Sequence, residues 1–367
     1  MGKVKKKNII IVGGGITGLS LLHYLTQKYA SREDIHLQLF ERENHPGGTV
    51  RSFKEEQGLF ETGPNGFLGT KKQTFKLINE LNLGSELIRA HEKASLRYIR
   101  MGNRLLPLPM APKALLQSEL LSVPAKWRFF LEPFIKKSAI ENESSYDFIK
   151  RRFGIQVAER FVDPAVSGIY AGDAQRILAK TAFPKLCSWE QQHGSILKAL
   201  SIEHKKMAEK PLLHSFKTGM GAVTEALFAK HKESICLNSQ VLKIFHRDDR
   251  FVISTSQENY KADELFICTP AYVGANLLKH LDVQISQDLK SICYAPVVVI
   301  AMVLSKRAFI KMPEGFGYLN PSSERSKVLG VLFESNVFSH RCHEQNMLVR
   351  FMIGGARHPD IHLRPKK

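Results

Sequence analysis

The sequence predicts an α/β fold that carries an inserted helical segment. Three observations support this prediction. An apolar run at residues 9–12 enters a glycine turn and then a helix-like pattern that reaches Tyr29. Helical composition extends from Pro109 to about residue 210. Strand-like segments return at residues 215–270 and 295–353. Strands on both sides of a helical segment indicate a first domain that is discontinuous in sequence.

The bulk composition restricts the class of partner. The chain has 367 residues, enough for a large core and two domains. Its net charge is +18, its pI is about 9.6 and its mean hydropathy is −0.18. Because the basic residues are spread out, without zinc-finger spacing or an RNP-like motif, we expect no nucleic-acid partner. An anionic membrane surface or an anionic small molecule would explain the charge.

The cysteines and apolar runs indicate the compartment. The five cysteines lie far apart and form no CxxC pair, so we expect reduced thiols in a cytoplasmic protein and no metal site. No stretch approaches the roughly 18 apolar residues of a membrane span. The basic start, MGKVKKK, precedes a short apolar run that ends in glycines, which is typical of a buried strand and not of a signal peptide.

The first motif is a glycine fingerprint between a strand and a helix. Four apolar residues lead into Gly13-Gly14-Gly15 and then Gly18. The first glycine permits a tight turn, the second allows a pyrophosphate to approach, and the third permits close helix packing. The next strand, at 36–40, ends in Glu41, at the distance expected for the acid that binds a ribose. This order predicts a Rossmann-like dinucleotide-binding domain.

Two further turns follow this motif. Pro46-Gly47-Gly48 suits contact with a phosphate or a flavin edge, but an ordinary glycine turn is equally compatible. Gly63-Pro64-Asn65-Gly66 can lie against a flat ring, with Asn65 as a polar group, or can be a simple type I turn.

The middle of the chain is predicted to be mainly helical. A helix at 71–90, with a stop signal at Gly84, precedes a hairpin at 96–108. Residues 111–137 combine basic and bulky aromatic side chains, Trp127 among them, at amphipathic spacing. This pattern suits a helix on a membrane surface or a helical subdomain with its own core. The glycines at 167–173 predict a turn that approaches something closely, and a domain crossover is equally compatible. Later strands are expected at 239–244, 251–254, 265–268, 295–304, 328–333 and 347–353.

These segments, in this order, resemble the protoporphyrinogen oxidase family, which are flavoproteins of the amine-oxidase superfamily. The motifs that carry the resemblance are GGGITG, the PGG turn, ETGPNGF, DPAVSGIYAGDAQRILAKTAFPKL, EQQHGSI, SFKTGMGAV, YAPVVV, EGFGYLNPSSE, VLGVLFES and MIGGA. They cover the chain from Asn8 to Ala356. SGIYAGD and GFGYL are typical of this family and not of amine oxidases at large.

The resemblance implies three domains and an FAD cofactor. The implied parts are an FAD-binding domain of amine-oxidase type at 1–90 and 211–275, a helical membrane-facing domain at 109–210, a substrate-binding domain with an antiparallel sheet at 91–108 and 276–360, and a tail at 361–367. The helical membrane-facing domain implies a peripheral position on the inner face of the membrane. The oligomeric state is left open, with a homodimer among the implied partners.

The resemblance also assigns roles to residues. Those assigned to FAD are Gly13, Gly14, Gly15, Gly18, Glu41, Arg42, Gly48, Gly63, Pro64, Asn65, Gly66 and Val241. Those assigned to the substrate are Arg97, Gly168, Phe316, Leu319, Leu332 and Met352. Arg97 would meet a substrate propionate, although its residue type and place alone fit a solvated hairpin arginine. Asn65 is the single polar candidate near the flavin, and the sequence shows no convincing general base.

The implied reaction is the oxidation of protoporphyrinogen IX to protoporphyrin IX in haem biosynthesis. Three rounds would each move a hydride from the macrocycle to FAD and release an N–H proton, with molecular oxygen as the final acceptor of six electrons. Coproporphyrinogen III, forming coproporphyrin, is the alternative substrate. A flavin oxidase of amines or polyenes is disfavoured by SGIYAGD, whereas an inactive porphyrin- or membrane-binding fragment stays open.

The family pattern continues after MIGGA with a second FAD-binding motif, where this sequence reads RHPDIHLRPKK. From this departure we expect weak FAD binding and little activity.

Overall fold

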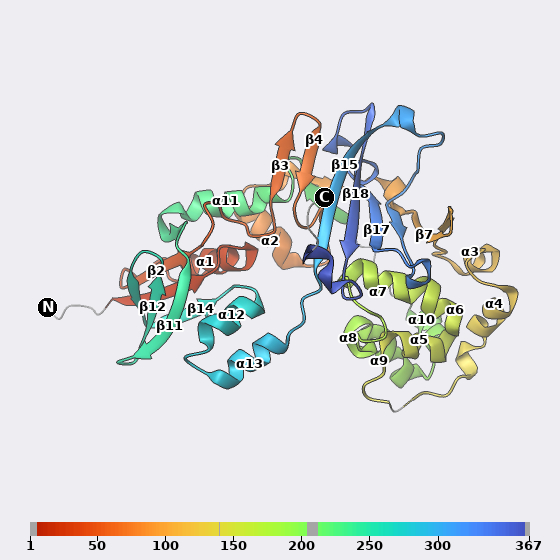
Figure 1. Cartoon of the computed structure of the whole chain (residues 1–367), viewed down its shortest axis with the longest axis horizontal. Helices are drawn as coiled ribbons and strands as arrows, with labels where there is room; N and C mark the ends of the chain where they lie inside the picture. Colours follow the sequence, from red (N-terminus) through yellow and green to blue (C-terminus); the bar gives the residue numbers. More distant parts are fainter. Residues whose placement is uncertain (1–5, 139, 204–211, 364–367) are drawn as a thin grey trace. The chain divides into compact units, whose positions relative to one another are not determined.

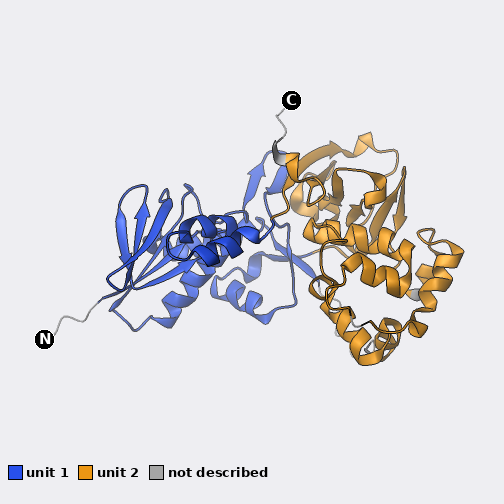
Figure 2. Ribbon diagram, turned by 60° about the horizontal axis from the view of Figure 1, so that its bottom comes forward, with its two compact units in different colours: residues 1–89, 212–293 blue, residues 90–211, 294–367 orange. Residues whose placement is uncertain are grey.

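A computed structural model describes residues 6–138, 140–203 and 212–363. The chain forms two compact units, which are coloured separately in Figure 2. Unit 1 contains residues 1–89 and 212–293, and unit 2 contains residues 90–211 and 294–367. Each unit has its own sheets and its own apolar core.

Unit 1 is built on a parallel sheet in the order β10-β2-β1-β14. Its strands are β1 (Lys7–Val12), β2 (Ile35–Phe40), β10 (Ile235–Cys236) and β14 (Glu264–Ile267). In the β1–β14 pair, Ile9 lies opposite Glu264, so the sheet is complete only after the chain has left unit 1 and returned. The strand-like runs at 9–12 and 265–268 therefore belong to one discontinuous unit.

Layers on both faces of this sheet (Figure 1) bury β1 from Ile9 to Val12. Helices α1 (Ile16–Lys28) and α11 (Gly221–His231) cover one face, where Ile9 and Ile11 point. An antiparallel sheet covers the other face, where Ile10 and Val12 point. That sheet contains β11 (Val241–Arg247), β12 (Arg250–Thr255) and β13 (Asn259–Ala262). The continuous apolar run of β1 follows from this double burial.

The other elements of unit 1 form two small sheets and several helices. They are β3 (Ser52–Glu55), β4 (Gly58–Glu61), β5 (Phe67–Leu68), α2 (Lys72–Glu80), η1 (Gly84–Glu86), β6 (Leu87–Arg89), β9 (Leu213–Phe216), η6 (Lys232–Ser234), α12 (Ala271–Leu278) and α13 (Val283–Ser291). The helix predicted for residues 71–90 was too long. It ends at Glu80, because Asn82 adopts a left-handed conformation (φ 57°) and residues 87–89 pair with β9.

Unit 2 contains a six-stranded sheet in the order β15-β18-β17-β16-β7-β8. Its strands are β7 (Arg97–Met101), β8 (Arg104–Pro107), β15 (Val297–Ser305), β16 (Gly317–Leu319), β17 (Val328–Phe333) and β18 (Asn346–Gly354). Neighbouring strands are antiparallel except for β16 and β7, which run parallel. The predicted hairpin at 96–108 is confirmed as β7 and β8.

Helices from the middle of the chain form the rest of unit 2, drawn yellow to green in Figure 1. They are α3 (Pro112–Gln117), α4 (Val123–Phe130), η3 (Glu132–Phe134), α5 (Ser145–Phe153), α6 (Ile155–Val157), η4 (Ala158–Val162), α7 (Asp163–Tyr170), α8 (Ala179–Ala182), α9 (Pro184–His193) and α10 (Ile196–Glu203). Short elements are η2 (Glu92–Ser95), η7 (Lys306–Ala308), η8 (Ser322–Glu324), α14 (Glu334–Val337), η9 (Ser339–Arg341) and η10 (Pro359–Leu363). Phe148, Val166 and Trp189 are among the residues of the helical core.

The turn predicted at 167–173 was largely wrong. Residues 163–170 form helix α7, which has a proline in its first turn and ends where Ala171 takes a left-handed conformation (φ 49°). Gly168 is helical, and a Cβ there would lie 2.4 Å from a methyl group of Leu319. The predicted close approach is therefore real, but a helix makes it. Four residues of the predicted tail, 364–367, lie outside the described residues, and the three-domain division stays a prediction.

Candidate functional site

The glycine fingerprint forms a loop between β1 and α1 in unit 1. Gly13 has a φ of 107°, which a side chain would strain. A Cβ at Gly18 would lie 1.9 Å from the Gly13 carbonyl oxygen, so the third glycine lets α1 pack on the loop. Helix α1 starts at Ile16 without a side-chain cap. Its first backbone N–H groups therefore form the positive end of a helix dipole, which suits a phosphate.

Glu41 closes the loop from the end of β2. Its carboxylate is buried and accepts a hydrogen bond from the Gly14 N–H at 2.6 Å. The other carboxylate oxygen accepts from the Glu43 N–H at 2.9 Å. The neighbouring Arg42 is exposed and pairs with Glu43 at 3.0 Å. Glu41 thus lies where a ribose next to the loop would meet it, while Arg42 points to solvent.

Two other predicted residues join this loop. The Gly47 N–H donates to the Gly14 carbonyl at 2.8 Å, and Gly47 forms a β-bridge with Gly15. A Cβ at Gly48 would lie 3.4 Å from the Gly15 Cα. Val241 starts β11 and packs in the core with Val12 and Phe40, close to the ends of β1 and β2. Segments predicted separately thus come together at one end of the parallel sheet.

The Gly63–Gly66 turn is held between two backbone segments of unit 1. A Cβ at Gly63 would lie 2.0 Å from the Thr49 carbonyl oxygen, and one at Gly66 would lie 2.6 Å from the His214 carbonyl oxygen. Side chains at either position would displace backbone. Pro64 and Asn65 connect these two contacts. Gly63 thus lies against Thr49, the residue after the Pro46-Gly47-Gly48 turn. That turn also bonds to the glycine loop through Gly47 and Gly14.

The loop fits the pyrophosphate of FAD. A Cβ placed on Gly15 would meet nothing within 4 Å, so open space adjoins the α1 N-terminus. An adjacent carboxylate for a ribose and an uncapped helix end are the groups that a dinucleotide requires. Gly13–Gly18, Glu41, Gly48 and Val241 would hold the adenosine and pyrophosphate portions.

In unit 2, four predicted substrate residues share one face of the six-stranded sheet. Arg97 pairs with Gly317, which pairs with Leu332. Two residues further along β16, Leu319 pairs with Gly330 of β17, and Gly330 also pairs with Met352 of β18. Because side chains alternate across a sheet, Arg97, Leu319, Leu332 and Met352 point to the same side. The Arg97 guanidinium is exposed and lies 5.2 Å from the centre of the Phe316 ring, a cation–π contact.

Helix α7 packs on this same face through Gly168. A Cβ there would overlap Leu319, and Gly330 leaves room for Leu319 from the sheet side. The buried Asp163 fixes this helix, a role that was not predicted from the sequence. Its carboxylate accepts the Ser322 N–H at 2.7 Å and pairs with Arg357. An Asp-Pro pair at a helix start was the available signal.

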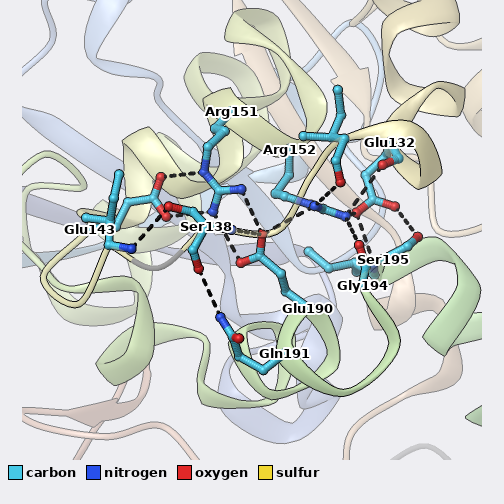
Figure 3. Close-up of polar contacts among 12 residues, drawn as sticks. Glu132, Ser138, Glu143, Arg151, Arg152, Glu190, Gln191, Gly194 and Ser195 are labelled. Carbon is cyan, nitrogen blue, oxygen red and sulfur yellow. Dashed lines mark hydrogen bonds and ion pairs between the residues drawn. The ribbon is translucent and has the colours of Figure 1, made fainter.

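The helical part of unit 2 also contains a buried charge cluster that was not predicted from the sequence (Figure 3). Its members are Glu132, Glu143, Arg151, Arg152 and Glu190. Arg152 and Glu132 form an ion pair and are both fully buried. Burial lowers the pKa of Arg152, whereas the hydrogen bond to Glu143 raises the pKa of Arg151. Because these residues come from segments that are distant in sequence, no local pattern signalled their contact.

Large apolar side chains are exposed on the segment that the charge cluster holds. Trp127 is 69% and Phe134 is 81% exposed, and Leu131 lies between them in sequence with 49% exposure. Lys126, Lys136 and Lys137 flank them. The predicted mixture of basic and aromatic residues is therefore present at the surface. In the described part of the chain, no helix has the length and apolar character needed to cross a bilayer.

Comparison with known proteins identifies the class. The model of the flavin-containing amine oxidoreductase family matches residues 16–367, so the chain belongs to this family. The chain is a flavin-containing oxidoreductase, in agreement with the FAD cofactor that the sequence predicts. The α/β fold of amine-oxidase type predicted from the sequence is confirmed.

Two named relatives within the family and one solved structure are similar to this chain over nearly its whole length. The chain is 25% identical to the chloroplastic protoporphyrinogen oxidase of Nicotiana tabacum, over 98% of this chain and 69% of that protein. It is 24% identical to the coproporphyrinogen III oxidase of Bacillus subtilis, over 96% of this chain and 78% of that protein. A crystal structure from Exiguobacterium sp. 255-15, provisionally described as a protoporphyrinogen oxidase, matches with a TM-score of 0.85 at 20% identity, over 98% of this chain and 80% of that one.

Proposed function

We propose that this protein is an FAD-dependent porphyrinogen oxidase that converts protoporphyrinogen IX to protoporphyrin IX, with molecular oxygen as acceptor. The observation that carries the proposal is the composition of one sheet face in unit 2. An exposed guanidinium, Arg97, borders the apolar side chains of Leu319, Leu332 and Met352. This combination suits a ligand with a large apolar ring and a carboxylate at its rim.

The residues of the chain would bind and orient the substrate. Arg97 would form a bidentate pair with a propionate, and the Phe316 ring holds its guanidinium in place. The apolar residues would bury the macrocycle with about 25 cal/mol per Å² of apolar surface removed from water. Bound FAD supplies hydride acceptance. Asn65 is the proposed polar group beside it, and the protein otherwise contributes pose and a dry environment.

The relatives support two substrates. Protoporphyrinogen oxidases and a coproporphyrinogen III oxidase are similar to this chain to nearly the same degree, 25% and 24% for the tobacco and Bacillus proteins. Coproporphyrinogen III has more propionates and would favour a face with further cations. Arg104 and Arg350 lie on the same sheet face as Arg97, but Arg104 pairs with Glu119 and Arg350 is buried. We therefore assign the propionate to Arg97 and place protoporphyrinogen first.

Membrane attachment is part of the proposal. The exposed Trp127, Leu131 and Phe134, flanked by lysines, suit insertion of apolar side chains below anionic headgroups. Such attachment would give a peripheral protein at the inner face of the membrane, where a poorly soluble porphyrinogen is delivered. Molecular oxygen and porphyrinogen are then the small-molecule partners.

The first experiment is an absorbance spectrum of the purified chain after addition of FAD and desalting. Flavin bands near one equivalent would support the proposal, whereas their absence would agree with the weak FAD binding expected from the departure after MIGGA. The second step follows porphyrin fluorescence with each porphyrinogen in turn. Higher kcat/KM on coproporphyrinogen III would select the alternative substrate. No porphyrin from either substrate, with FAD retained, would contradict the proposal and favour an inactive porphyrin- or membrane-binding protein.

A matched pair of variants tests the role of Arg97. Arg97→Met should raise KM by about tenfold or more, because a charged hydrogen bond is worth about 1.5–3 kcal/mol. Arg104→Met is the control, since Arg104 lies in the same hairpin, is exposed and pairs with Glu119. Equal kinetics for the two variants would contradict the assignment.

A further inference from the structure

The SFKTGMGAV motif leads into helix α11 of unit 1, and the proposed function gives this motif no role. Its glycines make room for the β3–β4 hairpin. A Cβ at Gly219, whose φ is 96°, would lie 2.9 Å from the Oε1 atom of Glu61 and would overlap the side chain of Ser52. A Cβ at Gly221 would lie 2.9 Å from the Ser52 backbone nitrogen. The motif therefore brings the start of α11 against the first residue pair of the hairpin, Ser52 and Glu61 (Figure 1).

The carboxylate of Glu61 lies at the N-terminal end of α11. Glu61 is 5% exposed, and its Oε1 atom accepts the Met220 N–H at 2.9 Å. Its Oε2 atom accepts the Ser52 hydroxyl at 2.6 Å, and the Ser52 oxygen accepts the Gly221 N–H at 2.8 Å. Both carboxylate oxygens thus bond to protein donors, at the positive end of the α11 dipole. Glu61 is therefore suited to hold the structure and not to contact a ligand.

Helix α11 depends on these acceptors because its own sequence provides none. Met220, its N-cap residue, has no side-chain oxygen, and its first turn reads GAVT, without an acidic residue. The first N–H groups of a helix have no partner within the helix and are normally satisfied by a capping side chain. Glu61 and Ser52 supply this cap from a hairpin that is about 160 residues earlier in the sequence.

Glu61 lies two residues before the Gly63–Gly66 turn, which is proposed to lie against the flavin ring. Between them, the Thr62 hydroxyl donates to the Thr49 carbonyl at 3.1 Å. The same carbonyl lies so close to Gly63 that it leaves no room for a side chain there. A displacement of Glu61 would therefore move the turn.

Helix α11 also holds the segment on the other side of this contact. Thr224, in the first turn of α11, donates its hydroxyl to the Val50 carbonyl at 3.1 Å. Val50 directly follows Thr49. The first turn of α11 thus fixes both of the backbone segments, 49–52 and 61–63, that meet at Gly63.

We propose that Glu61 is a positioning residue, which fixes the Gly63–Gly66 turn through the first turn of α11 and thereby sets the affinity for the flavin end of FAD. The groups proposed for the pyrophosphate lie on a separate loop, between β1 and α1. Loss of Glu61 should therefore affect one end of the cofactor selectively. This inference rests on the proposed function, because it takes the Gly63–Gly66 turn as a flavin contact.

Titration calorimetry of the full chain with FAD and with ADP separates the two ends of the cofactor and needs no turnover. Glu61→Gln should raise the dissociation constant for FAD at least about tenfold, because hydrogen bonds to a charged group are lost, and that for ADP less than about twofold. Glu55→Gln is the matched control, since Glu55 is an exposed acid of the same hairpin, and it should leave both constants unchanged. Equal losses for FAD and ADP would indicate a general structural effect and overturn the proposal.

Ser52→Ala is a smaller second change, because it removes only the hydroxyl that joins Glu61 to the Gly221 N–H. It should weaken FAD binding with the same selectivity over ADP. The double variant, Ser52→Ala with Glu61→Gln, should be no weaker than Glu61→Gln alone within about twofold, since the two side chains act as one unit. Additive losses would contradict the proposal.

Hydrogen exchange of the ligand-free chain distinguishes a failure of this inference from a failure of the proposed function. In Glu61→Gln, the peptide that spans residues 62–68 should exchange about tenfold faster, whereas residues 13–18 should be unchanged. A wild type that binds ADP but not FAD would count against the proposed function, and faster exchange at 62–68 would still support the role of Glu61. Unchanged exchange at 62–68 would overturn that role, whatever the result with the cofactor.

Discussion

Replacement of Glu132 by alanine should destabilise the helical part of unit 2 selectively. Glu132 lies in η3, and its buried carboxylate joins segments that are distant in sequence (Figure 3). It pairs with Arg152 from α5. It also accepts hydrogen bonds from the Ser195 hydroxyl at 2.5 Å and from the Ile196 N–H at 3.0 Å, at the start of α10.

The size of the effect follows from what the substitution leaves behind. Removing one partner of a buried ion pair costs about 3–5 kcal/mol, because the other charge stays buried. Arg152 keeps a contact with Glu190 at 3.3 Å and donates to the Ile135 carbonyl at 2.9 Å. These contacts compensate in part, so we expect the lower end, about 3 kcal/mol.

Tryptophan fluorescence during urea unfolding measures this effect without interference from unit 1. The chain has two tryptophans, Trp127 and Trp189, and both lie in the helical part of unit 2. With a slope of about 1–3 kcal/mol per M, the midpoint should fall by about 1–3 M. Glu119→Ala is the control, since Glu119 forms an exposed pair with Arg104 and should change stability by less than about 1 kcal/mol.

A loss for Glu132→Ala no larger than that of the control would refute this reasoning. It would mean that the buried pair contributes no more than a surface pair, and that η3 is held by apolar packing alone. The replacement of both Glu132 and Arg152 by methionine separates the two explanations. If the charges matter mainly by being left unpaired, the double variant should recover much of the loss.

Three further predictions concern other parts of the molecule. Gly18→Ala should abolish FAD retention after desalting, because its Cβ would lie 1.9 Å from the Gly13 carbonyl oxygen; retention equal to wild type would contradict the close packing of α1 on the glycine loop. Burial lowers the pKa of His231 to about 4. As pH falls, this histidine therefore takes up a proton in the unfolded chain before it does so in the folded chain. Stability present above about pH 6.5 should then decrease by up to about 3 kcal/mol toward pH 4, and His231→Gln should lose this dependence in urea titrations. Asp163→Asn should lower kcat/KM several-fold through the position of α7, with FAD retention unchanged; an unaltered KM and kcat would show that α7 needs no such anchor.

The cofactor loop was predictable because its signals are local. Strand, glycine turn, helix and Glu41 lie within the first 41 residues, and each has a physical requirement that the residue type reveals. The strand predicted at 328–333 has the same bounds in β17, because a buried apolar run between polar turns has few alternatives.

The prediction failed where tertiary contacts decide local structure. The two glycines of SGIYAGD indicate a turn by composition, yet α7 extends through Gly168 because Leu319 packs against it. The burial of Glu132 and Arg152 was equally invisible, since isolated charged residues in a helical segment are usually at the surface. Neither the length of α7 nor the burial of this ion pair could be predicted without knowing which segments contact each other.

The proposed cofactor groups and the proposed substrate face belong to different units, so variants in them should behave differently. The groups proposed for adenosine and pyrophosphate all lie in unit 1, between Gly13 and Gly48 and at Val241. The proposed substrate face, with Arg97, Leu332 and Met352, belongs to unit 2. Each unit has its own apolar core, so a surface change on that face leaves the glycine loop intact. Changes in KM without loss of flavin are therefore the signature of the substrate face, and loss of flavin is the signature of unit 1.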